Sequence, residues 1–583
     1  MKRSICKLLV MSIALIVLML AVAACRGNGE DTAADVQPPA ATPEPPVATP
    51  DPAQVEPEPD DNNGIPAIMN PIGTLPIVNE PVTLSVFHGA NPGIDFSTSP
   101  TSAWFEEQTG VQIEWIQVPQ ADLADRRNLI LATGDVPDIL FSGVGTHATV
   151  FFYAQMGLFR PITEYIDPFA PEMQRIFEQF PGIRDDMIMP DGNIYAFTAV
   201  DECFHCTMPQ KLWIYTPWLD ELGLTMPTTY QEFFDTMVAF RDYMPAILGV
   251  PHVYPFVGAT GGRNGVDVLI TPFIPNTEGS RFLVDNGVVT VSHNTEQFRD
   301  ALRFLNRMFE ANLIATETFV QDVPSRRNMV ENPGPPIVGS FPAMWIGGST
   351  AVDIADQEGR WNGFRVVPPL AGPDGVATAV YAPLMGNNRA VITNNLPEEL
   401  MPVAVRWLDN FYTEISALVS VQGMEGIHWR FAEPGEVGIH GGPALWARKA
   451  LLDAGQVDNV TYFQANPNFR DNHFRLGEVA NRDIVEQETL LFDMTVIQEP
   501  FRMRRDQIMP VVIFDEAQSA EVSDLSVSIN THVNESIARF IVGDLDIEND
   551  WDWYLRELEV MGLQRFIQLQ QQAFDERVAR LGN

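Results

Sequence analysis

The chain has 583 residues, and its 76 acidic residues outnumber its 36 basic ones, which gives a formal net charge of −40. Such an acidic chain is a poor partner for nucleic acid, because a phosphate-binding surface needs clustered Lys and Arg. Lysine occurs only at positions 2, 7, 211 and 449 and never after a glycine, so a P-loop is absent and any ATP-driven step belongs to another subunit. A body of about 500 residues is too large for one core and predicts at least two domains.

The N-terminus has the pattern of a secretory signal. Basic residues precede the apolar run Leu8–Ala21, and the residues Val22–Ala24 lead directly into Cys25. We predict that residues 1–24 are a signal peptide and that Cys25, the first residue after the cut, carries lipid. An uncleaved membrane anchor is the alternative, but the apolar run is short for crossing a bilayer.

A segment rich in Pro, Ala, Asp and Glu follows the lipidation site and extends to about residue 80. It cannot bury enough apolar surface to offset the entropy lost on ordering, and its prolines favour extended conformations. We therefore predict a disordered, lipid-anchored tether over residues 25–80. No later apolar run is long enough to cross a bilayer, so the chain is not itself a permease.

Strands and helices are predicted to alternate at the start of the body. Residues 82–87 alternate as a strand that ends at His88, and a helix follows that Gly110 terminates. A strand over 111–118, a helix ending at Gly134 and a strand reaching residue 141 come next. This order predicts an α/β lobe with a parallel sheet.

Two short β-rich runs, 194–200 and 211–215, are separated by a polar crossing, and a helix from Pro217 to Gly223 follows. We predict that this crossing is a hinge at which one domain passes the chain to another. Asp201 and Glu202 lie in it and are candidate ligand-binding residues.

The crossing also holds Cys203 and Cys206, with His205 between them. In an exported chain a C-x-x-C favours a small-loop disulfide. A thiol redox pair and half of a metal site are the alternatives, and the second would need another ligand pair, which is not visible nearby in the sequence. We expect a disulfide and no metal or other cofactor.

Several motifs, spread in a fixed order over nearly the whole mature chain, resemble those of one family. They are Trp104–Gly110, Thr133–Asp138, Asp191–Tyr195, Leu212–Leu224, Pro368–Gly375, Glu425–Trp429 and Asn549–Phe566. Together they resemble the extracellular solute-binding proteins of bacterial ABC importers, and the lipoprotein, oligosaccharide-binding branch in particular. Similar cysteine pairs occur in that family at this position, which favours a structural role for Cys203 and Cys206.

The resemblance implies a two-lobed α/β fold of the periplasmic-binding-protein type with a ligand cleft between the lobes. We expect residues 81–202 with 345–425 in one lobe and 203–344 with 426–583 in the other. The implied function is to capture an extracellular solute, an oligosaccharide, by lobe closure and to deliver it to the permease subunits of an ABC transporter. The resemblance and the lipid anchor predict a monomer on the outer face of the cytoplasmic membrane.

Aromatic side chains are the expected sugar platforms, because aromatic rings cover the apolar faces of pyranose rings. Trp345 lies in a strand that runs into Gly347-Gly348, and this stretch is either a tight connection or a cleft wall. Glycine-rich segments of sugar-binding relatives border the cleft, which favours the wall. Trp429 is either a core aromatic or a second platform, and His88 is a weaker candidate.

Calcium and catalysis have less support in the sequence. Many relatives carry an acidic calcium loop after the helix that we predict over 230–241, but residues 242–251 lack regularly spaced oxygen ligands. No H-E-x-x-H or G-x-S-x-G motif is present. A surface-anchored carbohydrate-active or thiol-redox enzyme remains an alternative, as does a receptor for peptides or another small polar solute.

Overall fold

The computed structural model describes residues 65–277, 279, 281–382, 386–449, 459–462 and 465–581. The predicted signal peptide, Cys25 and most of the predicted tether lie outside the described residues. The tether prediction is wrong for residues 65–80, because Met69, Ile77 and Val78 are buried in the core of the first lobe. Within the described part, no helix is both long and apolar enough to span a membrane.

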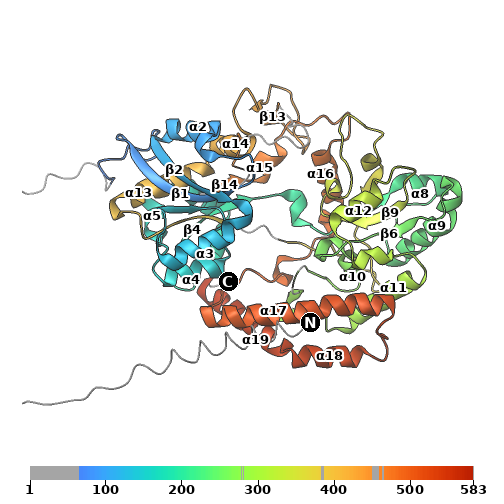
Figure 1. The fold of residues 1–583 in the computed structure, drawn as a ribbon. Helices are drawn as coiled ribbons and strands as arrows, with labels where there is room; N and C mark the ends of the chain where they lie inside the picture. Colours follow the sequence, from blue (N-terminus) through green and yellow to red (C-terminus); the bar gives the residue numbers. More distant parts are fainter. Residues whose placement is uncertain are drawn as a thin grey trace, which may run out of the picture. The chain divides into compact units, whose positions relative to one another are not determined.

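A six-stranded sheet organises the first lobe, in the order β14-β4-β11-β3-β1-β2 (Figure 1). The central strand β1, Val82–Ala90, pairs in parallel with β2, Val111–Pro119, and with β3, Ile139–Phe141. Helices α2, Pro100–Thr109, and α3, Leu123–Thr133, form the crossovers between these strands. Both helices end at glycines with positive φ, as their sequences predict.

The other half of this sheet comes from distant parts of the chain. β11, Asn387–Ile392, is antiparallel to both β3 and β4, and β4 covers Ala196–Asp201. β14, Asn468–Arg470, pairs in parallel with β4. The remaining helices of this lobe are α4 (His147–Gln155), α5 (Thr163–Phe169), α6 (Pro171–Gln179), α7 (Pro181–Met187), α13 (Met401–Asp409), α14 (Glu414–Gln422) and α15 (Asn472–Leu476).

The second lobe contains a four-stranded sheet in the order β10-β5-β9-β6. Its strands are β5 (Leu212–Tyr215), β6 (Tyr254–Phe256), β9 (Val338–Pro342) and β10 (Phe364–Val366). The helices that share its two apolar clusters or lie beside them are α8 (Thr216–Leu222), α9 (Tyr230–Leu248), α10 (Asp267–Ile270), α11 (Glu296–Glu310), α12 (Val323–Val330), α16 (Gln487–Gln498), α17 (Glu516–Val542), α18 (Trp551–Val560) and α19 (Leu563–Leu581).

Local sequence explains how two of these helices are positioned. A capping box precedes α9, with the Thr229 side chain accepting from the Glu232 backbone and Glu232 accepting in return. The apolar stripe of α11, which includes Phe298, Leu302 and Leu305, is fully buried in the core of the second lobe. Both features depend on short, local sequence patterns.

Two small antiparallel pairs complete the described elements. β7, Phe282–Asp285, and β8, Val288–Val291, form a hairpin across Asn286-Gly287, where both residues have positive φ. β12, Trp429–Phe431, pairs with β13, Trp446–Arg448.

The structure divides the lobes differently from the boundaries expected from the sequence. β10 pairs with β5 and therefore lies in the second lobe, although we expected residues 345–425 in the first. Conversely, Trp429, Trp446 and Phe474 pack in the core of the first lobe, and β14 joins its sheet, although we expected residues 426–583 in the second. The physical reason is that strand pairing and apolar packing between segments far apart in sequence decide the lobe.

Three segments connect the lobes: residues 202–211 between β4 and β5, the stretch between β10 and β11, and residues 477–486 between α15 and α16. Hydrogen bonds join the first segment to the second and to the end of β14. The Ala382 amide donates to the Thr207 oxygen at 2.8 Å, and the Glu202 amide donates to the Arg470 oxygen at 2.8 Å at the end of β14. The first crossing is thus held beside its neighbours, as a shared hinge requires.

Candidate functional site

One cavity, of about 530 Å³, lies beside the first crossing. Its lining includes Asp201 and Glu202, the α6–α7 junction, and arginines from the C-terminal third of the chain. The two acidic residues that we expected at the cleft therefore do line a cavity. Whether they bind a ligand depends on what they already bind.

Asp201 is engaged by two arginines. Both of its carboxylate oxygens accept from Arg475 Nη1, at 2.8 and 3.0 Å, and Arg470 forms a second ion pair with it. Glu202 accepts a hydrogen bond from the Asn472 amide at 3.0 Å. These carboxylates thus hold the crossing against β14 and α15, so a ligand would have to compete for them.

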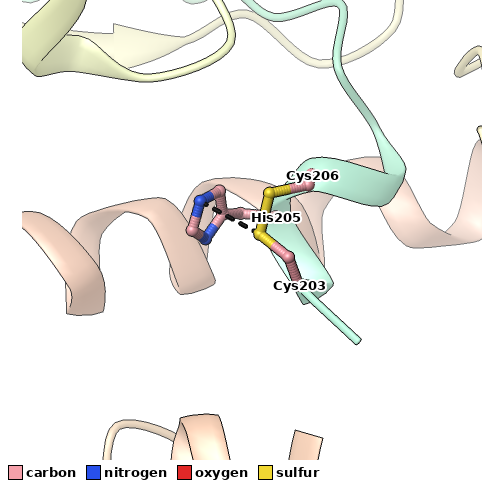
Figure 2. Close-up of side chains that lie close together, drawn as sticks. All are labelled: Cys203, His205 and Cys206. Atoms are coloured by element: carbon pink, nitrogen blue, oxygen red, sulfur yellow. Dashed lines mark hydrogen bonds between the residues drawn. A yellow bond between two sulfur atoms is a disulfide. The ribbon is translucent and has the colours of Figure 1, made fainter. Parts of the chain in front are cut away.

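Cys203 and Cys206 form a disulfide in this crossing (Figure 2). The Nε2 atom of His205 lies 3.4 Å from the Cys203 sulfur, and burial lowers the pKa of His205 to about 3. These three side chains are close enough to share a metal ion. Because the sulfurs are bonded to each other, they are not thiolates and do not act as ligands.

The buried side chain of Lys211 bonds to the backbone of the same crossing. It is fully buried, and its Nζ donates to the backbone oxygens of His205, at 2.7 Å, and Met208, at 2.6 Å. Burial lowers its pKa from 10.5 to about 7, and Arg263 acts in the same direction. The disulfide and this lysine together fix the shape of the segment between β4 and β5.

A second cavity, of about 610 Å³, lies at the carboxyl ends of β1 and β3. In parallel α/β sheets this edge is where ligands bind, because loops rather than helices cover it. Asn91, Gln120 and Ser142 supply polar side chains to the lining, and Phe96 and Tyr462 supply aromatic rings. The two rings are buried and back the cavity, so the polar side chains are the groups that suit a polyhydroxylated solute.

Glycines allow the start of α3 to approach these strand ends. A Cβ at Gly143 would lie 2.5 Å from Leu123 Cδ2, and a Cβ at Gly89 would lie 2.8 Å from both Leu123 Cδ2 and Gln120 Oε1. Gly143 also has a φ of 62°, and Ser142 before it has a φ of 72°. A non-glycine residue in this conformation is uncommon and marks a backbone held by its surroundings.

Arg389, on β11, is the charged residue of this cavity among the described residues. Its side chain is half-buried, makes no hydrogen bond or ion pair within the described part of the chain, and has an Nε that is buried without a partner. Burial lowers its pKa, and the charge of Asp201 opposes that shift. An arginine in this state can donate hydrogen bonds to an acceptor group of a ligand.

His88 lies behind the wall of the cavity. Its ring is fully buried and stacks on Phe96, with ring centroids 4.1 Å apart, while Trp115 contacts it edge-on. Burial lowers its pKa to about 4, so the ring is neutral at physiological pH. His88 therefore supports Phe96 and does not itself reach solvent.

Trp345, in the second lobe, is 41% exposed. A Cβ at Gly347 would lie 2.4 Å from its ring, so the glycine is required by the close approach of the indole. Arg326 holds both ends of this loop, donating to the Pro342 oxygen at 2.6 Å and the Ser349 hydroxyl at 2.8 Å. An exposed ring on a fixed loop is what a sugar platform needs.

Trp429 is a core aromatic and not a second platform. Its side chain is fully buried in the first lobe, and its Nε1 donates to the Gly423 oxygen at 2.9 Å. The sequence allowed either a core aromatic or a second platform, and the packing supports the core aromatic. Trp345 is thus the exposed member of the predicted pair.

The segment where relatives carry a calcium loop is helical here. α9 continues through residues 242–248 and ends at Gly249, which has a φ of 68°. Asp242 pairs with Arg241 at 2.7 Å. This geometry offers no loop of converging oxygen atoms.

A sequence family described as bacterial extracellular solute-binding protein matches residues 96–417. This chain belongs to that family. The membership confirms the resemblance that the motifs predicted.

Individual relatives of this solute-binding protein support the family membership. The fructooligosaccharide ABC transporter substrate-binding protein FusA of Streptococcus pneumoniae serotype 4 is 23% identical over 81% of this chain and 86% of FusA. Lipoprotein LipO of Bacillus subtilis is 22% identical over 58% of this chain and 65% of LipO.

Solved structures show the same fold. FusA of Streptococcus pneumoniae in complex with kestose has a TM-score of 0.68 at 21% identity, over 85% of this chain and 100% of FusA. An HMO-binding solute-binding protein of Bifidobacterium longum infantis has a TM-score of 0.72 at 16% identity, over 85% of this chain and 99% of its own. The expected two-lobed α/β fold of a solute-binding protein is confirmed.

Sequence reasoning missed the cavity at the strand ends. Ser142 directly follows a predicted strand, so its position was a usable signal, whereas Asn91 follows β1, which runs to Ala90, beyond the predicted end at His88. Arg389 gave none, because it lies within an antiparallel strand whose neighbours, β3 and β4, come from distant parts of the chain.

Proposed function

We propose that this protein is the receptor of an ABC importer and captures an oligosaccharide outside the cell. The observation that carries the proposal is the 610 Å³ cavity at the strand ends of the first lobe, which combines amides, a hydroxyl, an arginine and aromatic rings. Family membership and the fructooligosaccharide-binding role in the name of FusA support it.

Capture would occur by closure of the lobes. Each lobe has its own sheet and its own apolar core, so each can move as a body. A solute that contacts both lobes only when they are closed stabilises that state by its differential affinity. In this proposal Trp345 covers one sugar face from the second lobe, and Asp201 and Glu202 lie at the base of the cleft.

The N-terminal region would keep the receptor near its permease. Cleavage after residue 24 would leave Cys25 to carry lipid, and the following residues, up to the start of the packed body at about residue 65, would act as the tether. The protein would then reside as a monomer on the outer face of the cytoplasmic membrane and hand its solute to separate permease subunits. LipO, a relative named as a lipoprotein, supports this arrangement.

We also infer that the solute is released unaltered, since the family and the relatives are binding proteins. A panel of oligosaccharides and peptides, mixed with purified full-length protein in detergent, tests the whole proposal. We expect one or more oligosaccharides to raise the melting temperature and to remain intact on chromatography. Stabilisation by peptides alone, or the appearance of cleavage products, would overturn the proposal.

A further inference from the structure

The charge of the cavity at the strand ends is opposite to the charge of the chain. The protein carries a formal charge of −40, yet Arg389 is the charged residue in the described lining of this cavity, and no described carboxylate accompanies it. The cavity is therefore locally positive within a strongly acidic protein.

The carboxylate best placed to neutralise Arg389 is already occupied. Asp201 acts on Arg389 through its charge, but its oxygens accept from Arg470 and Arg475. Three arginines thus lie near Asp201. Among the described residues, the side chain of Arg389, which lines the cavity, makes no hydrogen bond or ion pair. A half-buried guanidinium left in this state has lost water contacts without gaining a protein partner.

Buried cations in the second lobe add to the imbalance. Lys211 and Arg326 are both fully buried, and the partners of both are neutral oxygens: backbone carbonyls for Lys211, and carbonyls, an amide oxygen and a hydroxyl for Arg326. Lys211 lies in the first crossing, and Arg326 holds the loop of Trp345. The charge of Arg326 is not cancelled by a carboxylate among these partners, so it raises the potential at the aromatic platform, whereas Lys211, whose pKa burial lowers to about 7, is only partly charged near neutral pH.

We propose that the oligosaccharide is acidic and that a sugar carboxylate, as in a uronic acid, binds Arg389. The planar guanidinium matches a carboxylate with two parallel hydrogen bonds, which are stronger than bonds to neutral hydroxyls. This inference rests on the proposed function and narrows it to one class of solute. Gln120, Asn91 and the Ser142 hydroxyl then contact the neutral hydroxyls of the same sugar.

Matched acid and ester pairs test the charge directly. Full-length protein in detergent is titrated calorimetrically with oligomers of galacturonate, mannuronate and glucuronate, three to eight sugars long, each beside its own methyl ester. We expect at least one free acid to bind ten or more times more tightly than its ester.

Two variants of Arg389 and one control variant test whether the preference for acid over ester arises at Arg389. Arg389→Gln should remove most of the preference for acid over ester, and Arg389→Lys should keep part of it, because the charge remains but the fork does not. Arg556→Gln, at an exposed position of α18, makes the same change in net charge and should leave the preference unchanged. Circular dichroism checks that each variant is folded, and Arg389→Lys serves if Arg389→Gln is not.

The inference is overturned if no acid binds more tightly than its ester, or if the preference survives in both Arg389 variants. Binding of neutral fructo- or malto-oligosaccharides in place of the acids would overturn it while leaving the proposed function intact. Binding of no oligosaccharide at all would overturn both.

Discussion

Asp201 accepts hydrogen bonds from Arg475 through both of its carboxylate oxygens, at 2.8 and 3.0 Å, and so ties the first crossing to α15. The side chains of this ion pair are 27% and 22% exposed, so solvent screens them only in part. We predict that Asp201→Asn lowers the free energy of unfolding by about 2 kcal/mol, because two arginines lose their counter-charge. Urea denaturation followed by tryptophan fluorescence measures this.

The matched control is Asp506→Asn. Asp506 also pairs with an arginine, Arg504, but both side chains are about 70% exposed. We expect no measurable change in stability for this variant. Equal effects at the two positions would show that the Asp201 pair is no more than a surface contact.

Lys211 should make stability depend on pH in the alkaline range. The unfolded chain protonates this amine below about pH 10.5, whereas the folded chain does so only below about pH 7. Between these values the unfolded chain binds more protons, so the contribution of Lys211 to stability rises with pH. We predict that the stability gained by Lys211→Met relative to the wild type is largest at and below pH 7 and shrinks toward pH 10. Parallel curves for the two proteins would contradict the burial of a poorly neutralised amine.

Replacing Trp345 by alanine should mainly weaken ligand binding, whereas replacing Trp429 by alanine should mainly lower stability. Trp345→Ala removes an exposed ring, so we expect the affinity for the bound oligosaccharide to fall at least about tenfold while stability changes by less than about 1 kcal/mol. Trp429→Ala leaves a cavity in the core of the first lobe and should cost roughly 3–5 kcal/mol of stability. Calorimetric titration and urea denaturation of each variant provide the two readouts. Unchanged affinity in Trp345→Ala would remove that residue from the site.

Cys203 and Cys206 are expected to be oxidised in the exported protein. Mass spectrometry of peptides prepared without reductant should find the crossing two hydrogens lighter than the dithiol form. Alkylation of both cysteines in material purified in air would contradict the disulfide. The double variant Cys203→Ser/Cys206→Ser should unfold more readily, since it loses a constraint on the segment between β4 and β5.

Local chemistry made much of the fold predictable. The glycines that end α2 and α3, the capping box of α9 and the apolar stripe of α11 each depend on a few neighbouring residues, so short sequence patterns suffice for them. The family motifs supplied the two-lobed arrangement. The lobe boundaries could not be obtained this way, because β14 joins β4 across more than 260 residues.

The candidate site was harder to predict, for the same reason. The sequence left the roles of both Trp429 and Trp345 open, and only packing separates the buried ring from the exposed one. Asp201, expected in the crossing, is the last residue of β4 beside it, and its two arginine partners lie on β14 and α15 and carry no signal in the sequence near it. Arg389 is recognised only from the structure, where its side chain makes no hydrogen bond or ion pair with the described residues.

Lobe closure around an oligosaccharide is the central claim, and a distance between the lobes tests it most directly. Spin labels on Glu114→Cys, exposed on β2, and Glu310→Cys, exposed at the end of α11, report one lobe each, since the cysteines of the crossing are joined in the disulfide. We predict that the pulsed electron resonance distance between the labels shortens when an oligosaccharide that stabilises the protein is added, and that it returns when the sugar is removed. A distance that stays the same with the sugar bound to saturation would contradict the account.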